Sequence, residues 1–152
     1  MARQIDVRVD GIKELENRFK TLEKEGRKRV ARQINVNALE YQRAVRKTIR
    51  KRTGRHIRYR SRKDGSRWHW SSSPGAPPNS DTGNLAGQIR VTRRASSVQT
   101  KMGAFVISGA KYSSALEFRR DRSKRRPFMI PVINKNRKLF VERIKRAIMG
   151  LI

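Results

Sequence analysis

The sequence predicts an α+β fold. We expect a small mixed or antiparallel sheet packed by a long N-terminal helix and a C-terminal helix, with a protruding basic β-hairpin. Three patterns lead to this expectation: helical spacing of apolar residues over 12–49, the same spacing after residue 131, and short alternating stretches between them. A chain of 152 residues suits one domain, so we assign residues 1–152 to a single domain.

The N-terminal part predicts a strand followed by a long helix. Residues 5–9 alternate apolar and charged side chains, which is typical of a short half-buried strand. Asp10 can cap the helix that follows. The apolar stripe over 12–49 is narrow and crosses Gly26, so the pattern predicts one long helix, or two in line, packed on one side only. The helix is expected to stop at residues 53–54.

Residues 55–70 predict a β-hairpin. Asp64 and Gly65 supply its turn, and aromatic and basic residues alternate on both arms. The hairpin has few aliphatic residues, so we expect it to protrude. A second interpretation makes its apolar residues the inward face of a hairpin that rests on a neighbour: Ile57, Tyr59, Trp68 and Trp70. Residues 71–80, rich in Ser and Pro, predict an extended or mobile loop.

The rest of the chain predicts short elements in alternation. In order they are a capped turn or short helix at 81–85, a strand at 88–92, a strand pair at 98–101 and 104–108, an amphipathic helix at 111–118, a loop at 119–126, and a final helix after 127–131. The apolar face of the helix at 111–118 is expected to consist of Tyr112, Ala115, Leu116 and Phe118. The strands, together with residues 5–9, are expected to form the sheet.

The charge is large and unevenly placed. Thirty-nine Lys and Arg against twelve Asp and Glu give a net charge of +27. Residues 1–26 hold equal numbers of acids and bases, so the whole excess lies in residues 27–152. Such a body repels itself unless a negative partner is near, which points to a polyanion or an acidic protein surface. The alternative is a solvated surface kept soluble by charge, but small domains usually carry a net charge of only about 2–8.

Two basic segments and their neighbours are the candidate sites. Lys and Arg neutralise phosphates, and aromatic rings stack on bases or on guanidinium groups. The residues expected to contact nucleic acid or an acidic partner are Arg55, Arg58, Arg60, Arg62, Lys63, Arg67, Arg119, Arg120, Arg122, Lys124, Arg125 and Arg126. Those expected to contact another subunit are Tyr59, Trp68, Trp70, Pro74, Pro77 and Pro78.

Several classes of function find no support in the sequence. There is no cysteine, and the two histidines, His56 and His69, are too few for a His-rich metal site. No pair of poised carboxylates or His–carboxylate set is visible, so we expect no enzyme, no metal and no cofactor. No apolar run approaches the ~20 residues that span a bilayer, and no signal peptide is evident. We expect a soluble protein, made and used in the cytosol or within a particle, with no membrane partner.

Five segments in order resemble a known family. They are Pro74-Gly75-Ala76-Pro77-Pro78, Asp81-Thr82-Gly83-Asn84-Leu85, Gln88-Ile89-Arg90-Val91, the stretch from Ala110 to Phe118, and Arg126-Pro127-Phe128-Met129-Ile130-Pro131. This order resembles the tail-completion and head–tail joining proteins of long-tailed phages, the minor tail proteins similar to lambda's tail-completion protein. The chain departs from the family pattern at Arg119-Arg120, where members often have Gly-Thr, and in the basic hairpin.

The resemblance implies an α+β virion protein without catalysis. Its copies would form a homo-oligomeric ring at the neck or tail end, made in the host cytoplasm. Its partners would be other neck and tail proteins, such as the connector, the tail terminator or the tube, with possible contact to genomic DNA. The alternative from a different class is a basic nucleic-acid-binding module, for DNA packaging or associated with ribosomes. An enzyme such as a nuclease is the weakest alternative, because a carboxylate cluster for a metal is missing.

Overall fold

The computed structural model describes residues 12–51, 54, 57–60, 68–80, 82–98 and 102–149, and it leaves the side chains of 12–16, 18, 19 and 93 undescribed. The strand expected at 5–9 lies outside the described residues. The structure has the predicted α+β class: a long N-terminal helix, a C-terminal helix, and two small antiparallel sheets.

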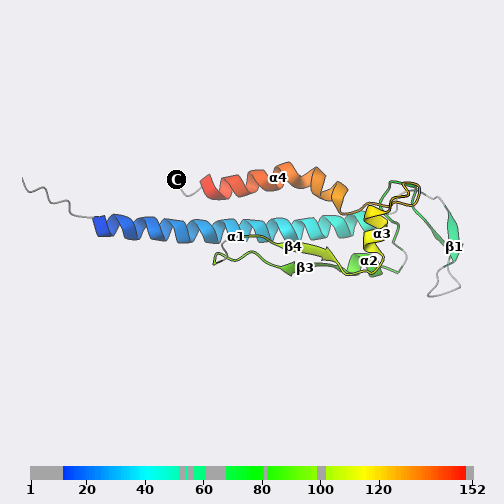
Figure 1. Cartoon of the computed structure of the whole chain (residues 1–152), viewed down its shortest axis with the longest axis horizontal. Helices are drawn as coiled ribbons and strands as arrows, with labels where there is room; N and C mark the ends of the chain where they lie inside the picture. The colour runs from blue at the N-terminus through cyan, green and yellow to red at the C-terminus, as the bar shows by residue number, and fades with distance from the viewer. Residues whose placement is uncertain are drawn as a thin grey trace, which may run out of the picture.

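One unbroken helix forms the axis of the molecule. Helix α1, Ile12–Arg50, runs through Gly26 without interruption, so the first of the two sequence alternatives is the observed one. Figure 1 shows the C-terminal half of α1 between two layers, with helix α4 on one side and strands β3 and β4 on the other. The expectation that α1 packs on one side only is therefore wrong in its C-terminal half. Its stripe there is flanked by Asn and Gln side chains that bond to backbone on both sides.

The core lies around the last turns of α1. Its buried apolar residues are Val45, Ile49, Leu85, Ala86, Ile89, Ala110, Phe128 and Val132. They come from α1, from the short helix α2 (Asn84–Gly87), from strand β3 (Ile89–Arg93) and from the start of α4 (Ile130–Met149), except that Ala110 follows strand β4 and Phe128 lies just before α4. The core is small for a chain of this length, because it occupies only the end of α1 that lies away from the N-terminus (Figure 1).

The larger sheet pairs β3 with β4. Strand β4, Phe105–Ser108, runs antiparallel to β3, and of its predicted partner at 98–101 only Val98 is described. Val98 lies in a turn and is 88% exposed, and residues 99–101 lie outside the described residues. The strand predicted at 88–92 is confirmed, with Ile89 buried and Val91 half-buried on the face toward α1. The side chain of Asn35 on α1 holds the segment after β3, because its Nδ2 donates to Ala95 O at 2.9 Å and its Oδ1 accepts from Ala95 N at 2.7 Å.

Helix α4 runs antiparallel to α1 along its other side (Figure 1). The buried Asn37 of α1 donates from Nδ2 to Phe140 O at 3.1 Å and accepts from Gln33 at 3.0 Å, so its amide is satisfied. Glu40 and Arg143 form an ion pair between the same two helices. These polar links fix the axial position of α4 on α1, while Val132 and Phe140 supply the buried apolar contact.

Helix α3, Ser113–Phe118, is present but faces differently from its prediction. Of its expected apolar face only Leu116 packs against the core; Phe118 is 65% exposed and Tyr112 and Ala115 are exposed. The buried residue is Glu117. The helix is too short for periodicity to decide its face, and a buried carboxylate needs hydrogen-bond partners that only the fold supplies.

Candidate nucleic-acid and subunit interface

The basic hairpin projects from one end of the molecule, opposite the N-terminal end of α1 (Figure 1). Strand β1, Arg58–Arg60, pairs antiparallel with β2, Trp68–Trp70, in a register that sets Arg58 opposite Trp70 and Arg60 opposite Trp68. Residues directly opposite each other share a face of the sheet. The two tryptophans therefore share a face with the two arginines, while Tyr59 lies with His69 on the other face. The predicted common face of Tyr59 with Trp68 and Trp70 is wrong, because the register separates them.

The arginine face is held together by cation–π contacts. The guanidinium carbon of Arg58 lies 4.6 Å from the centroid of the Trp68 ring, and that of Arg60 lies 5.3 Å from it. At exposed sites such contacts are worth about 0.5–1 kcal/mol each. Both arginines are exposed, and no carboxylate of the described residues pairs with them. The indole thus presents two guanidinium groups side by side to solvent, which suits binding to phosphate or carboxylate oxygens.

The described aromatic residues of the hairpin are only partly covered by their own chain. Trp68 is 48% and Trp70 39% exposed, and Ile57 and Tyr59 are also exposed. Their exposure is compatible with both sequence interpretations, contact to nucleic acid and contact to another subunit. Four further candidate bases lie outside the described residues: Arg55, Arg62, Lys63 and Arg67.

The base of the hairpin is tied to the loop 71–80. Ile57 N donates to Ser71 Oγ at 3.0 Å, and Ser71 N donates to Ile57 O at 2.9 Å. Asn79 Nδ2 donates both to Gly54 O at 3.1 Å and to Trp70 O at 2.9 Å. Gly54 itself has a φ of +72°, which disfavours any residue with a Cβ. The hairpin is therefore oriented by the loop that follows it.

The proline-rich loop makes contacts within its own chain. Gly75 N donates to Arg125 O at 3.0 Å, and Pro78 is buried while Pro77 is half-buried. Among the three prolines proposed as subunit contacts, Pro74 alone is exposed. The sequence could not distinguish them, because burial depends on how the loop packs in the fold and the loop contacts the distant Arg125.

That segment contains bases of two kinds. Arg125 Nε donates to Glu117 O at 2.8 Å, and Arg126 donates to Ser72 O at 3.0 Å and to Ser123 O at 2.9 Å. These two half-buried arginines brace the loop against α3 and the hairpin base. The exposed bases are Arg119, Arg120, Arg122 and Lys124. Lys124 pairs with Asp121 at 3.4 Å; hydrogen bonds from Ser123, followed by Lys124, lower the pKa of Asp121.

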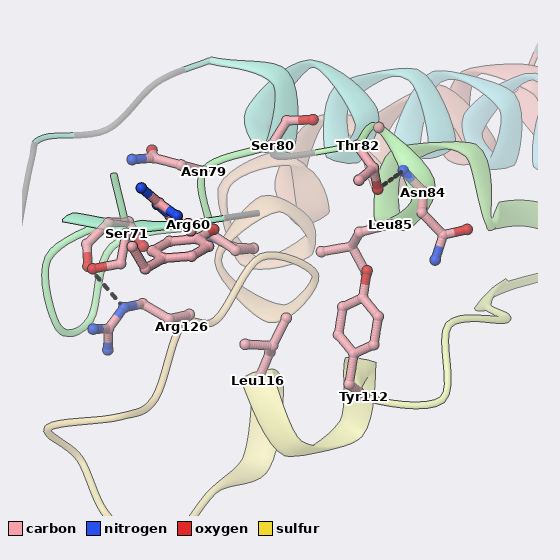
Figure 2. A pocket seen from close by; sticks show the side chains of 14 residues that line it. Arg60, Ser71, Asn79, Ser80, Thr82, Asn84, Leu85, Tyr112, Leu116 and Arg126 are labelled. Carbon is pink, nitrogen blue, oxygen red and sulfur yellow. Dashed lines mark hydrogen bonds between the residues drawn. The ribbon is translucent and has the colours of Figure 1, made fainter. Parts of the chain in front are cut away.

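A cavity of about 580 Å³ lies under the hairpin base. Figure 2 shows Leu85 from α2, Tyr112 from the residue before α3 and Leu116 from α3 turned into the same space, with Arg60 and Arg126 at its other side. Ser72, whose Oγ is buried without a hydrogen-bond partner, also lines it. The lining mixes Leu, Pro and Tyr side chains with Ser, Thr and Asn side chains and has two arginines at one end, so the cavity offers a contact surface.

Glu117 is the important residue that the sequence analysis did not identify. Its Oε2 accepts from the backbone amides of Phe128 at 2.8 Å and Met129 at 3.1 Å, and its Oε1 accepts from Ile130 N at 2.8 Å. These amides open α4, where a helix N-terminus favours negative charge. Tyr41 donates to Met129 O at 3.0 Å, and burial, followed by the charge of Glu117, raises the pKa of Tyr41 to about 12. No pattern in the sequence marks this residue, because its three partners lie 11–13 residues further along the chain.

Neither metal nor membrane signals appear where the structure is described. His69 lies 6.1 Å from the Tyr59 ring, centroid to centroid, and His56 lies outside the described residues. Within the described ranges, no three His, Cys, Asp or Glu residues gather closely enough to hold a metal ion. No described helix is long and apolar enough to cross a membrane.

Comparisons with protein families, with curated proteins and with solved structures gave no match to this chain. The functional argument therefore rests on the residues and their geometry.

Proposed function

We propose that this protein is a structural virion protein of a long-tailed bacteriophage, one that completes the tail and joins it to the head as part of a neck ring. It would not act as an enzyme. The observation that carries the proposal is the shape of the subunit: an elongated body with a small core at one end and a basic, partly uncovered hairpin projecting from that end (Figure 1). This arrangement suits a subunit that completes its burial in an assembly.

Incomplete burial supports the oligomeric part of the proposal. Residues 20–25 of α1 are exposed, so this stretch of the helix has little cover from the described part of its own chain. On the outer face of β4, Phe105 and Ile107 are exposed two residues apart. Exposed apolar groups beside an open helix favour contacts between copies.

The charge supports a negative neighbour. Ion pairs such as Glu40–Arg143 and Glu142–Arg146 each join one acid to one base. Such pairs leave the excess of +27 uncompensated. Copies of this chain in a ring would repel one another unless DNA passed through the ring or acidic neck proteins docked on it.

A nucleic-acid-binding module remains the second candidate, and the Arg58–Trp68–Arg60 contact favours it. Adjacent guanidinium groups and exposed aromatic rings are the parts of a surface that neutralises phosphates and stacks on bases. Such a module would act as a monomer or dimer, whereas a neck protein would form a defined ring of more copies.

The test is removal of the chain from the phage genome that encodes it. We expect separate DNA-filled heads and separate tails by electron microscopy, and joining of the two when the purified chain is added. Normal joined particles in the absence of the chain would contradict the proposal.

A further inference from the structure

Strand β4 has an open edge. Gly109 N donates to Gln88 O at 2.9 Å, which makes Gln88 and Gly109 a hydrogen-bonded pair. In an antiparallel ladder the next pair, Ile89 with Ser108, then turns its backbone groups outward, as does Val91 with Val106. The opposite edge of the sheet, formed by β3, is covered by α1, because Gln42 and Arg46 of α1 donate to Ile89 O at 2.9 and 2.8 Å. On the β4 side, the backbone groups of Val106 and Ser108 meet no described hydrogen-bond partner.

An apolar groove runs beside this edge. A cavity of about 290 Å³ is lined by Ala104 and Val106, by Ile34, Ala38 and Tyr41 of α1, and by Ile133, Phe140 and Ile144 of α4. Its amide-bearing residue, Asn37, already bonds to Phe140 and Gln33. A strand added to β4 would place alternate side chains over this groove and the others toward solvent. A short strand with one apolar face would therefore fit both features, because its backbone would bond to the edge of β4 and its apolar side chains would fill the groove.

Residues 5–9 have this pattern. Ile5, Val7 and Val9 are β-branched and would face the groove, while the charged Asp6 and Arg8 would face solvent. Residues with branched Cβ atoms suit the half-buried surface of a sheet.

The same copy cannot supply this strand. Helix α1 is continuous from Ile12, and at a rise of ~1.5 Å per residue Ile34 lies ~33 Å and Ala38 ~39 Å from Ile12 along the axis. Fully extended, the chain from residue 12 back to residue 5 spans at most ~25 Å. Figure 1 shows the same relation, because the N-terminal end of α1 extends far beyond β3 and β4.

We propose that residues 5–9 of a second copy add to the open edge of β4, with Ile5, Val7 and Val9 in the groove between α1 and α4. Each copy then gives one strand and receives one, which is a head-to-tail contact of the kind that closes into a ring when the rotation permits. This inference rests on the proposed assembly of several copies, and it names the contact that joins them.

The test uses the absence of cysteine from the chain. Two proteins are prepared, one with Arg8→Cys and one with Ile107→Cys, an outward residue of β4. After mixing, a short bismaleimide should give a cross-linked product of twice the chain mass that contains both variants. A parallel sample uses Asp6→Cys in place of Arg8→Cys. A cysteine at position 107 can reach the position directly opposite it on the added strand and also the diagonal position two residues away. The matched control replaces Ile107→Cys by Leu139→Cys on the exposed face of α4 and should give no such product.

The contact between copies and the assembly itself are measured separately. Val7→Asp should abolish the cross-link, whereas Glu14→Gln should leave it intact. Native mass is recorded for every variant. If the protein assembles but neither pair cross-links between copies, this inference is wrong and the proposed ring stands. If a chain carrying both Arg8→Cys and Ile107→Cys cross-links only within itself, the inference is also wrong. If the unmodified chain is monomeric, this inference and the proposed function fail together.

Discussion

The carboxylate of Glu117 accepts a hydrogen bond from the backbone amide of Phe128 at 2.8 Å, and the Phe128 ring is fully buried in the core. One side chain of α3 thereby fixes both the first turn of α4 and the largest side chain of the core. The basic segment 119–126 lies between these two residues, so its position depends on the same bond.

Glu117→Gln tests this role. The amide oxygen can replace only part of the acceptor capacity that three backbone amides use, and loss of hydrogen bonds to a buried charge costs about 1.5–3 kcal/mol. Urea unfolding should show a decrease of that size in the free energy of unfolding. The control Glu142→Gln removes an exposed acid that pairs with Arg146, and should change it by less than about 1 kcal/mol. Equal effects from the two variants would contradict the assignment.

Stability should fall with alkaline pH in part because of Tyr41. Its pKa is about 12 in the folded chain, against an ordinary value near 10, so the folded state binds the proton more tightly than the unfolded state. Tyr41 therefore contributes stability below pH 10 that is lost as pH rises toward 12. Unfolding measured across this range should show a shallower fall for Tyr41→Phe than for the parent. Parallel profiles would argue against a raised pKa.

Substitution of a half-buried arginine in 119–126 should destabilise the protein more than substitution of an exposed one. Arg126→Ala removes bonds to Ser72 O and Ser123 O and should cost about 1–3 kcal/mol of unfolding free energy. Arg122→Ala changes an exposed side chain and should stay within about 0.5 kcal/mol. Thermal unfolding of both variants, side by side, provides the comparison. A neutral Arg126→Ala would mean that the arginine does not brace the loop.

The arginine face of the hairpin should determine salt-dependent binding. In the double variant Arg58→Ser and Arg60→Ser, we expect weaker binding to duplex DNA and a decrease of roughly 1–2 in the slope of log affinity against log salt. Folding should survive, because both side chains are exposed. Fluorescence anisotropy over a salt series measures the slope. An unchanged slope would leave the hairpin charge as a solubility feature or a protein contact.

The sequence predicted the elements better than their contacts. Periodicity over 12–49 and after residue 131 predicted both long helices, and alternating aromatic and basic residues predicted the paired strands of the hairpin, because these signals are local. The turn predicted at Asp64-Gly65 lies outside the described residues. The pairing of β3 with β4 was missed, because a choice between neighbouring strands depends on packing against α1. The place of the tryptophans beside Arg58 and Arg60 was missed, because register decides the face.

The sequence predicted which segments form the candidate site, but only the structure shows which of their side chains are exposed. Charge and aromatic content identified the hairpin, but burial separated Arg125 and Arg126 from the exposed bases. Glu117 could not be found from a pattern, since its partners lie beyond the intervening basic loop.

The most direct test of a ring-forming neck protein is the native mass of the purified full chain, recorded at low and high salt. We expect one discrete assembly of more than two copies that persists at high salt, because apolar contacts between copies are not screened. The double variant Trp68→Ala and Trp70→Ala should form less of this assembly. A monomer or dimer at every concentration and salt would contradict it and would favour the nucleic-acid-binding module.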